Sequence, residues 1–174
     1  MPAYQMPAYQ MKAQWALYQA QTSQQTLAKG LEEYYAINPH LKRGTQLSSQ
    51  AREFFRAHDT VHVLCGCDTS MTHEAVVKVS SLFGTTGGMA VIRGYVLQES
   101  IDIYRKLPWG DTLKAVVIAP CLITRTLWCC AHQRERWPWA DHESFMDMPL
   151  CEIRSRFGIK VVLATQSRQR SNTA

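Results

Sequence analysis

Hydrophobic residues recur three and four positions apart along most of the chain, which is the spacing of one face of a helix. Serine, threonine or aspartate precedes several of these segments, and glycine or proline follows them, as at helix ends. The pattern predicts an all-α, helical-bundle-like single domain of six to eight helices. The expected segments are 11–30, 31–38, 48–66, 70–84, 87–107, 111–137, 140–148 and 149–158.

Two positions within these segments carry specific expectations. Gly30 should end the first helix, and Pro120 should kink the helix that begins at Asp111, because proline removes a backbone donor. Only residues 159–164 have the character of a strand, and one strand of this length builds no sheet.

The two ends of the chain differ in pattern from its middle. Residues 1–10 contain MPAYQ twice and have no apolar periodicity, so we expect a flexible extension there. Residues 166–174 are polar and predict a disordered tail. The folded domain is therefore expected to span 11–165. The N-terminal residues resemble neither a secretory signal nor a mitochondrial transit peptide.

Composition narrows the class of protein. A content of 46% hydrophobic and 19% charged residues is typical of a soluble globular domain. The longest apolar segment is interrupted by Pro120 and Arg125, so no membrane-spanning helix is expected. The net charge of +5 comes from short basic groups that suit either a solvated helix face or an anionic partner. Nucleic-acid binding is not expected, because no basic run is interleaved with stacking aromatic residues.

The cysteine pattern argues against disulfides and against a cysteine-based zinc site. No secretory signal precedes the cysteines, and no pair has the spacing of a zinc knuckle. We expect free, mostly buried thiols in a reducing compartment. Cys65 and Cys67 flank Gly66 at a predicted helix end, which favours packing over metal binding.

The candidate chemistry lies in the segment 48–66. Each residue of a helix advances about 100° around the axis, so His62 lies about 40° and Asp59 about 100° from His58. These three side chains share one quadrant of the helix, next to apolar neighbours. After a tight turn, Glu74 falls in the first turn of the following helix. Its carboxylate can close a site from there.

Two histidines and two carboxylates suit a divalent metal ion. We expect zinc first; iron, manganese and cobalt also suit these ligands, and magnesium suits them less because it prefers oxygen. If one carboxylate only supports a ligand, the remaining two histidines and one carboxylate leave positions open for water or substrate.

Spacing alone leaves a second interpretation equally open. His58 and His62 would then be an ordinary helical pair, and Asp59 would bond to His62 or to an arginine. His73, directly before Glu74, is expected to be a neighbour rather than a ligand.

The order H-D-x-x-H, eleven residues, then E resembles the signature of the coenzyme Q biosynthesis protein 4 family, with His58, Asp59, His62 and Glu74 in the four positions. The surrounding sequence is similar as well, in FFRAHDTVHVLCG, in EAVVK and in the closing MPLCEIRSRFGI. The similarity covers 47–159.

This resemblance implies a function in ubiquinone biosynthesis. The four residues would bind a divalent metal, and an adjacent apolar channel would hold a polyprenyl lipid, which makes 11–165 a metal- and lipid-binding domain. The segments 89–104 and 115–128 are candidates for the channel, although their periodicity favours ordinary core. The implied activity is metal-dependent oxidative decarboxylation of a polyprenylated hydroxybenzoate, in which the metal contacts the carboxylate and phenolic oxygen.

The resemblance also implies partners and a location. The expected partners are a polyprenyl aromatic or isoprenoid lipid, other ubiquinone-biosynthesis proteins whose complex the protein helps to organise, and a second copy in a homodimer. Without a transit peptide we expect a bacterial member in the cytoplasm, peripherally associated with the inner face of the membrane.

Two alternatives remain at this point. One is a non-catalytic isoprenoid-lipid-binding scaffold in which the metal anchors a head group. The other is a metal phosphohydrolase of the histidine-aspartate type, which would use His40, His58, Asp59 and a later aspartate such as Asp102. This phosphohydrolase hypothesis leaves His62 and Glu74 without a role.

Overall fold

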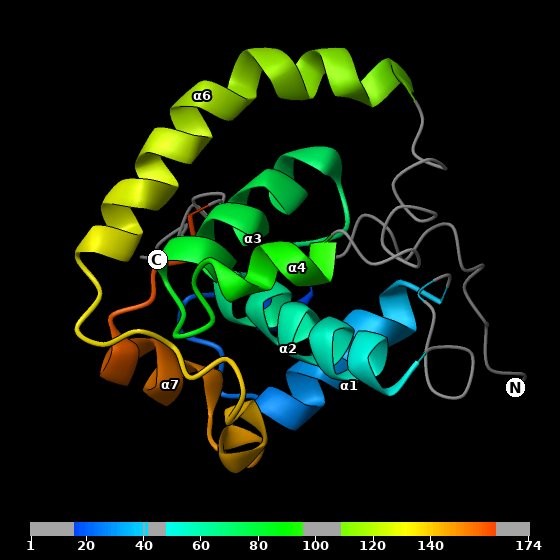
Figure 1. Cartoon of the computed structure of the whole chain (residues 1–174). Helices are drawn as coiled ribbons and strands as arrows, with labels where there is room; N and C mark the ends of the chain where they lie inside the picture. The colour runs from blue at the N-terminus through cyan, green and yellow to red at the C-terminus, as the bar shows by residue number, and fades with distance from the viewer. Residues whose placement is uncertain (1–15, 40, 42–47, 96–108, 163–174) are drawn as a thin grey trace, which may run out of the picture.

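The computed structural model of the chain describes residues 16–39, 41, 48–95 and 109–162, with the backbone alone for 109–119. These residues form six α-helices and no strand, which confirms the predicted all-α fold (Figure 1). Two short 3-10 helices, η2 (Leu17–Gln19) and η4 (His142–Phe145), accompany them. The α-helices are α1 (Leu27–Ile37), α2 (Ser49–Cys65), α3 (Met71–Phe83), α4 (Ala90–Tyr95), α6 (Trp109–Ala131) and α7 (Leu150–Phe157).

Helix α2 lies between α1 and α3 in the middle of the fold (Figure 1). Every residue from Ala57 to Cys65 is buried, as expected of a helix that is covered on all sides. The Ser48 side chain accepts a hydrogen bond from the N–H of Ala51 at 3.2 Å, and Gly66 follows the helix in the left-handed conformation, with φ of 67°. Both ends therefore lie where the sequence predicts them.

The predicted helix end at Gly30 is wrong, because this glycine lies inside α1. The helix begins after Thr26, whose side chain accepts a hydrogen bond from the N–H of Lys29 at 3.3 Å. A Cβ atom on Gly30 would lie 2.8 Å from Val63 Cγ1 and 3.1 Å from Leu150 Cδ1. The missing side chain lets α1 approach α2 and α7 closely.

Helix α6 runs without interruption through Pro120 and packs along α3. It begins at Trp109, two residues before the predicted start at Asp111. Figure 1 shows the helix arching over α3 and changing direction along its length. Leu122 and Thr126 are buried side chains of this helix.

The prediction of an α-helix over 140–148 is wrong: the segment forms η4 and turns. The carbonyls of Met146 and Met148 accept hydrogen bonds from the N–H groups of Ala28 and Leu27, at 2.9 and 3.0 Å. These carbonyls therefore satisfy N–H groups at the start of α1 that have no partner within that helix. The final helix, α7, ends at Gly158 with φ of 73°, as predicted.

A buried arginine joins three of these elements. Arg154 on α7 is 1% exposed, and its guanidinium donates to four backbone carbonyls. Two of them, Val63 and Leu64, belong to the last turn of α2 and accept at 2.9 Å each. The other two, Tyr18 and Ala20, belong to η2 and its end.

All six cysteines are free, as predicted. Only Cys65 and Cys67 are buried, so the expectation of mostly buried thiols is wrong. Cys121 on α6 is exposed, and the remaining three are half-buried.

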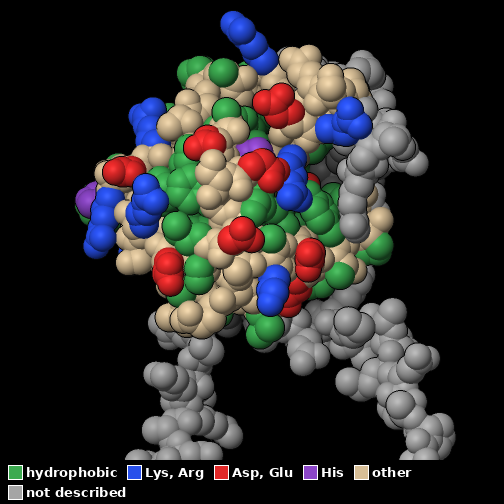
Figure 2. Space-filling model, turned by 90° about the horizontal axis from the view of Figure 1, so that it is seen from below, with side chains coloured by type: hydrophobic (Ala, Val, Ile, Leu, Met, Phe, Trp, Pro, Cys, Tyr) green, Lys and Arg blue, Asp and Glu red, His purple; other side chains and the backbone are tan. Residues whose placement is uncertain are grey.

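Several predictions fall outside the described residues, namely the extension 1–10, the tail 166–174 and most of the segment 87–107. The described part of the strand-like segment, 159–162, forms no strand. In the parts of the chain that the structure describes, no helix combines the length and the apolar character needed to cross a membrane. Figure 2 shows one face on which basic and acidic side chains are interspersed among hydrophobic ones, which favours a solvated surface there.

Candidate metal centre

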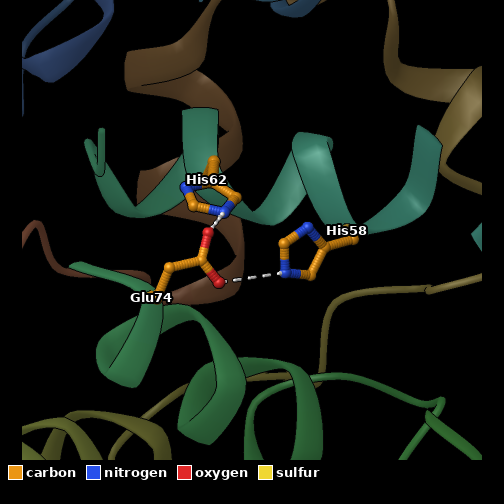
Figure 3. A group of neighbouring side chains, drawn as sticks. All are labelled: His58, His62 and Glu74. Carbon is orange, nitrogen blue, oxygen red and sulfur yellow. Dashed lines mark ion pairs between the residues drawn. The ribbon is translucent and has the colours of Figure 1, made fainter. Parts of the chain in front are cut away.

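The side chains of His58 and His62 on α2 point toward Glu74 on α3 (Figure 3). His62 Nε2 lies 3.1 Å from Glu74 Oε1, and His58 Nε2 lies 3.9 Å from Glu74 Oε2. One ligand atom from each residue lies within 4.8 Å of the other two. Ligands of a tetrahedral zinc ion lie roughly 3.3 Å apart, given bonds of about 2.0 Å. The cluster is therefore close to the size that one cation requires.

The connection between α2 and α3 determines how Glu74 meets the histidines. Gly66 adopts φ of 67°, and the N–H of Cys67 donates to the carbonyl of His62 at 2.8 Å, which reverses the chain directly after α2. Glu74 then falls in the first turn of α3. The placement that the sequence predicted for this carboxylate is confirmed.

His58 and His62 are buried, Glu74 is partly buried, and all three have unsatisfied polar atoms. Their exposed fractions are 7% for His58, 0% for His62 and 14% for Glu74. All four ring nitrogens and Glu74 Oε2 have no hydrogen-bond partner among the described residues. Although His62 Nε2 lies 3.1 Å from Glu74 Oε1, the pair does not have the geometry of a hydrogen bond. A divalent cation would satisfy one nitrogen of each histidine and the Glu74 carboxylate, so the donor set fits such an ion.

The charges within the cluster support each other. Burial alone would raise the pKa of Glu74, but His62, His58 and Lys78 outweigh it and lower this pKa to about 2. Burial alone would lower the pKa of His62, but Glu74 and Asp59 raise it above its ordinary value. A metal ion that binds His62 would compete with a proton for the ring nitrogen.

Asp59 lies beside the cluster rather than in it. It is not among the residues whose ligand atoms converge. Its Oδ1 lies 3.6 Å from His58 Nδ1, and its Oδ2 accepts a hydrogen bond from the Tyr35 hydroxyl at 2.8 Å. Burial, assisted by Asp59, raises the pKa of Tyr35, so this hydroxyl keeps its proton. Local spacing did not indicate Tyr35, because this residue lies on α1, 24 positions before Asp59.

Aromatic rings surround the two histidines. The ring of Phe54 stacks on His58 with centroids 5.9 Å apart, and Tyr95 meets His58 edge-on at 5.7 Å. Tyr34 lies 5.2 Å from His62. These rings keep water away from the cluster and so strengthen electrostatic interactions inside it.

His73 is a neighbour of the cluster, as predicted. Its Nδ1 accepts a hydrogen bond from the N–H of Asp68 at 2.8 Å, so the ring faces the turn before α3. His40 and Asp102, which the phosphohydrolase hypothesis requires, lie outside the described residues.

The two candidate channel segments, 89–104 and 115–128, are described only in part. Their described hydrophobic residues mix core and surface positions, so the channel stays a prediction. Buried ones are Val91 and Leu122, and exposed ones are Met89, Ile92, Leu127 and Trp128.

Comparison of the chain with protein-family models, with curated proteins and with solved structures finds no match. A functional interpretation of this chain therefore depends on the geometry and chemistry of its site.

Proposed function

We propose that the protein is a divalent-metal protein of the coenzyme Q biosynthesis protein 4 family that acts in ubiquinone biosynthesis. The observation that supports this proposal is the convergence of His58, His62 and Glu74, three residues of the family's signature, on one small buried volume. The proposed reaction is oxidative decarboxylation of a polyprenylated hydroxybenzoate, with zinc as the first metal to test.

In this proposal His58, His62 and Glu74 hold the ion. When bound, the ion supplies Lewis acidity toward the carboxylate and phenolic oxygen of the substrate. Three protein ligands leave coordination positions open for these oxygens. Phe54 and Tyr95, which contact each other with centroids 5.2 Å apart beside His58, provide an apolar wall for an aromatic ring and exclude water.

The proposal includes the partners that the resemblance implies. They are an isoprenoid lipid, other ubiquinone-biosynthesis proteins, a second copy of the chain and the inner face of a bacterial membrane. Exposed apolar side chains at the end of α3 and around α4, namely Phe83, Met89 and Ile92, are compatible with such contacts.

A non-catalytic isoprenoid-lipid-binding scaffold is the second candidate. The aromatic cluster beside the metal centre favours it, because Phe54 also contacts Trp139 with centroids 5.8 Å apart. A site with a metal ion and an apolar wall can anchor a lipid head group without chemistry.

The first prediction concerns metal binding by the full chain. After removal of metal by a chelator, Zn²⁺ at a hundred times its dissociation constant should stabilise the protein by about 2.7 kcal/mol. For a domain of this size the melting temperature should rise by roughly 5 to 10 °C. Glu74→Gln should abolish most of this rise, because it removes the charged ligand. Elemental analysis and thermal unfolding with and without Zn²⁺ measure both effects.

His132→Gln is the matched control, because His132 is an exposed histidine beyond the end of α6. It should retain the full response to Zn²⁺. If the unaltered chain and Glu74→Gln carry equally little metal and respond equally to Zn²⁺, the proposed metal site is wrong.

Activity distinguishes the two candidate functions. The metal-loaded chain should release CO2 from a polyprenyl-hydroxybenzoate when dioxygen is supplied, and Glu74→Gln should not. Lipid extraction followed by mass spectrometry tests the scaffold: co-purified isoprenoid lipid without CO2 release favours it. Absence of both contradicts both candidates.

A further inference from the structure

The two ring nitrogens of His58 face different carboxylates. Nε2 is directed toward Glu74, 3.9 Å from Oε2, whereas Nδ1 lies 3.6 Å from Asp59 Oδ1. An imidazole binds a metal ion through one nitrogen and carries its proton on the other. Histidine ligands usually donate that proton to a carboxylate or carbonyl, which fixes the orientation of the ring. In His58, Nε2 is therefore placed to bind a metal ion, and Nδ1 is placed to carry the proton toward Asp59.

The Asp59 carboxylate, which lies beside His58 Nδ1, is itself held in place. The Tyr35 hydroxyl donates to Asp59 Oδ2 at 2.8 Å, and the side chain of Asp59 is only 11% exposed. Arg56 donates a hydrogen bond to Glu143 Oε1 at 3.2 Å and interacts electrostatically with Tyr35. One oxygen of Asp59 is thus engaged by α1, and the other is left facing His58.

We infer that Tyr35 and Asp59 are positioning residues of the metal centre: Tyr35 fixes the Asp59 carboxylate, and Asp59 orients His58 so that its Nε2 binds the ion. This inference rests on the proposed metal-binding function. It differs from the four-ligand set that the sequence suggests, because Asp59 acts here through His58 and does not bind the ion.

The test uses the full chain, stripped of metal and titrated with Co²⁺, whose visible absorption reports its ligands. Asp59→Asn should weaken binding by about 10- to 100-fold, the usual effect of removing a carboxylate that supports a histidine ligand. Its absorption band should match that of the unaltered protein, because the ligands stay the same. Glu74→Gln should change the band or abolish it.

Tyr35→Phe should weaken binding in the same direction and by no more than Asp59→Asn. The double variant should bind as Asp59→Asn does, because Tyr35 acts through Asp59. In the Zn²⁺-loaded protein, nitrogen NMR should find the proton of His58 on Nδ1, a signature that a general loss of stability does not produce.

Tyr18→Phe is the matched control. It removes another buried hydroxyl, which donates to the backbone carbonyl of Cys67 at 3.1 Å, and should leave Co²⁺ affinity unchanged. The inference is overturned if Tyr35→Phe binds Co²⁺ as tightly as the unaltered protein, if Tyr18→Phe weakens binding equally, or if Asp59→Asn alters the band as Glu74→Gln does. If the unaltered chain binds neither Co²⁺ nor Zn²⁺, the proposed function fails together with this inference; the other outcomes leave that function intact.

Discussion

Cysteine side chains in this fold have very different surroundings, and a thiol reacts only as its thiolate. Cys65 and Cys67 are fully enclosed, and burial raises the pKa of both. Burial also raises the pKa of the half-buried Cys130, to about 12. Cys121 is exposed on α6. Local surroundings, not sequence position, therefore determine the reactivity of each thiol.

At pH 8 a thiol with a pKa near 12 is ionised in roughly one molecule in ten thousand. Iodoacetamide should therefore modify Cys121 first and Cys130 much more slowly, and Cys65 and Cys67 should react only after unfolding. Peptide mass spectrometry after timed alkylation measures this order. Early modification of Cys65 in folded protein would contradict the buried position of this side chain.

At the scale of elements, helix ends were predictable where a local rule decides them. Helix α2 begins after Ser48 and ends before Gly66, as predicted. A hydroxyl cap and a left-handed glycine each determine a helix end through contacts within a few residues. The helix end predicted at Gly30 is wrong, because a glycine is needed there for the close approach of Val63 and Leu150 on other helices. The segment 140–148 was also predicted wrongly, and its carbonyls contact the start of α1, which is distant in sequence. Contacts between distant segments leave no mark in local spacing.

The same distinction applies to the metal centre. His58, His62 and Glu74 could be predicted, because one helix, a tight turn and the next helix suffice to bring them together. The relation of Asp59 to Tyr35 could not, because it depends on how α1 packs against α2. Spacing indicated that these residues lie close together, but not that the Asp59 carboxylate lies outside the cluster of His58, His62 and Glu74.

Gly66 and Gly88 both have positive φ but differ in the space around them, so alanine substitutions at the two positions distinguish backbone strain from side-chain crowding. Gly66 has φ of 67°, and a Cβ there would lie 2.8 Å from Val161 Cγ1. Gly88 has φ of 48°, but the nearest atom to a Cβ is 4.0 Å away. Gly88→Ala should cost about 1 to 2 kcal/mol of unfolding free energy from the backbone alone. Gly66→Ala should cost an additional 1 to 3 kcal/mol, roughly, from overpacking.

Urea denaturation of the two glycine variants measures both costs. Equal losses of unfolding free energy would mean that the chain around Gly66 relaxes freely, contrary to the close packing described.

At the scale of the whole molecule, Arg154 connects the two ends of the described chain. Its guanidinium binds carbonyls of Tyr18 and Ala20 near the beginning, and of Val63 and Leu64 in α2. The guanidinium places a positive charge at the C-terminal end of α2, which complements the partial negative charge of a helix C-terminus. Burial lowers the pKa of Arg154 to about 10, so the side chain remains charged at neutral pH.

Arg154→Met should reduce the unfolding free energy by about 3 kcal/mol or more, because it leaves several buried carbonyls without a donor. Arg154→Lys should recover little of this loss, since an ammonium cannot reach carbonyls in a planar fork. The control is Arg52→Met on the exposed face of α2, with an expected change within about 0.5 kcal/mol. Chemical denaturation at neutral pH measures the unfolding free energy of the three variants and of the unaltered protein. Similar losses for Arg154→Met and Arg52→Met would contradict the connecting role.

The short chain separation between α2 and Glu74 also bears on the order of events during folding. His58, His62 and Glu74 lie in one helix–turn–helix unit, and closing so short a loop costs little chain entropy. Contacts that are local in sequence form early, and the N-terminal part of a chain is synthesised first. The three candidate ligands can thus meet on the ribosome before α6 and α7 are made. A metal ion captured at that stage would act as a nucleus for folding, onto which the later helices close.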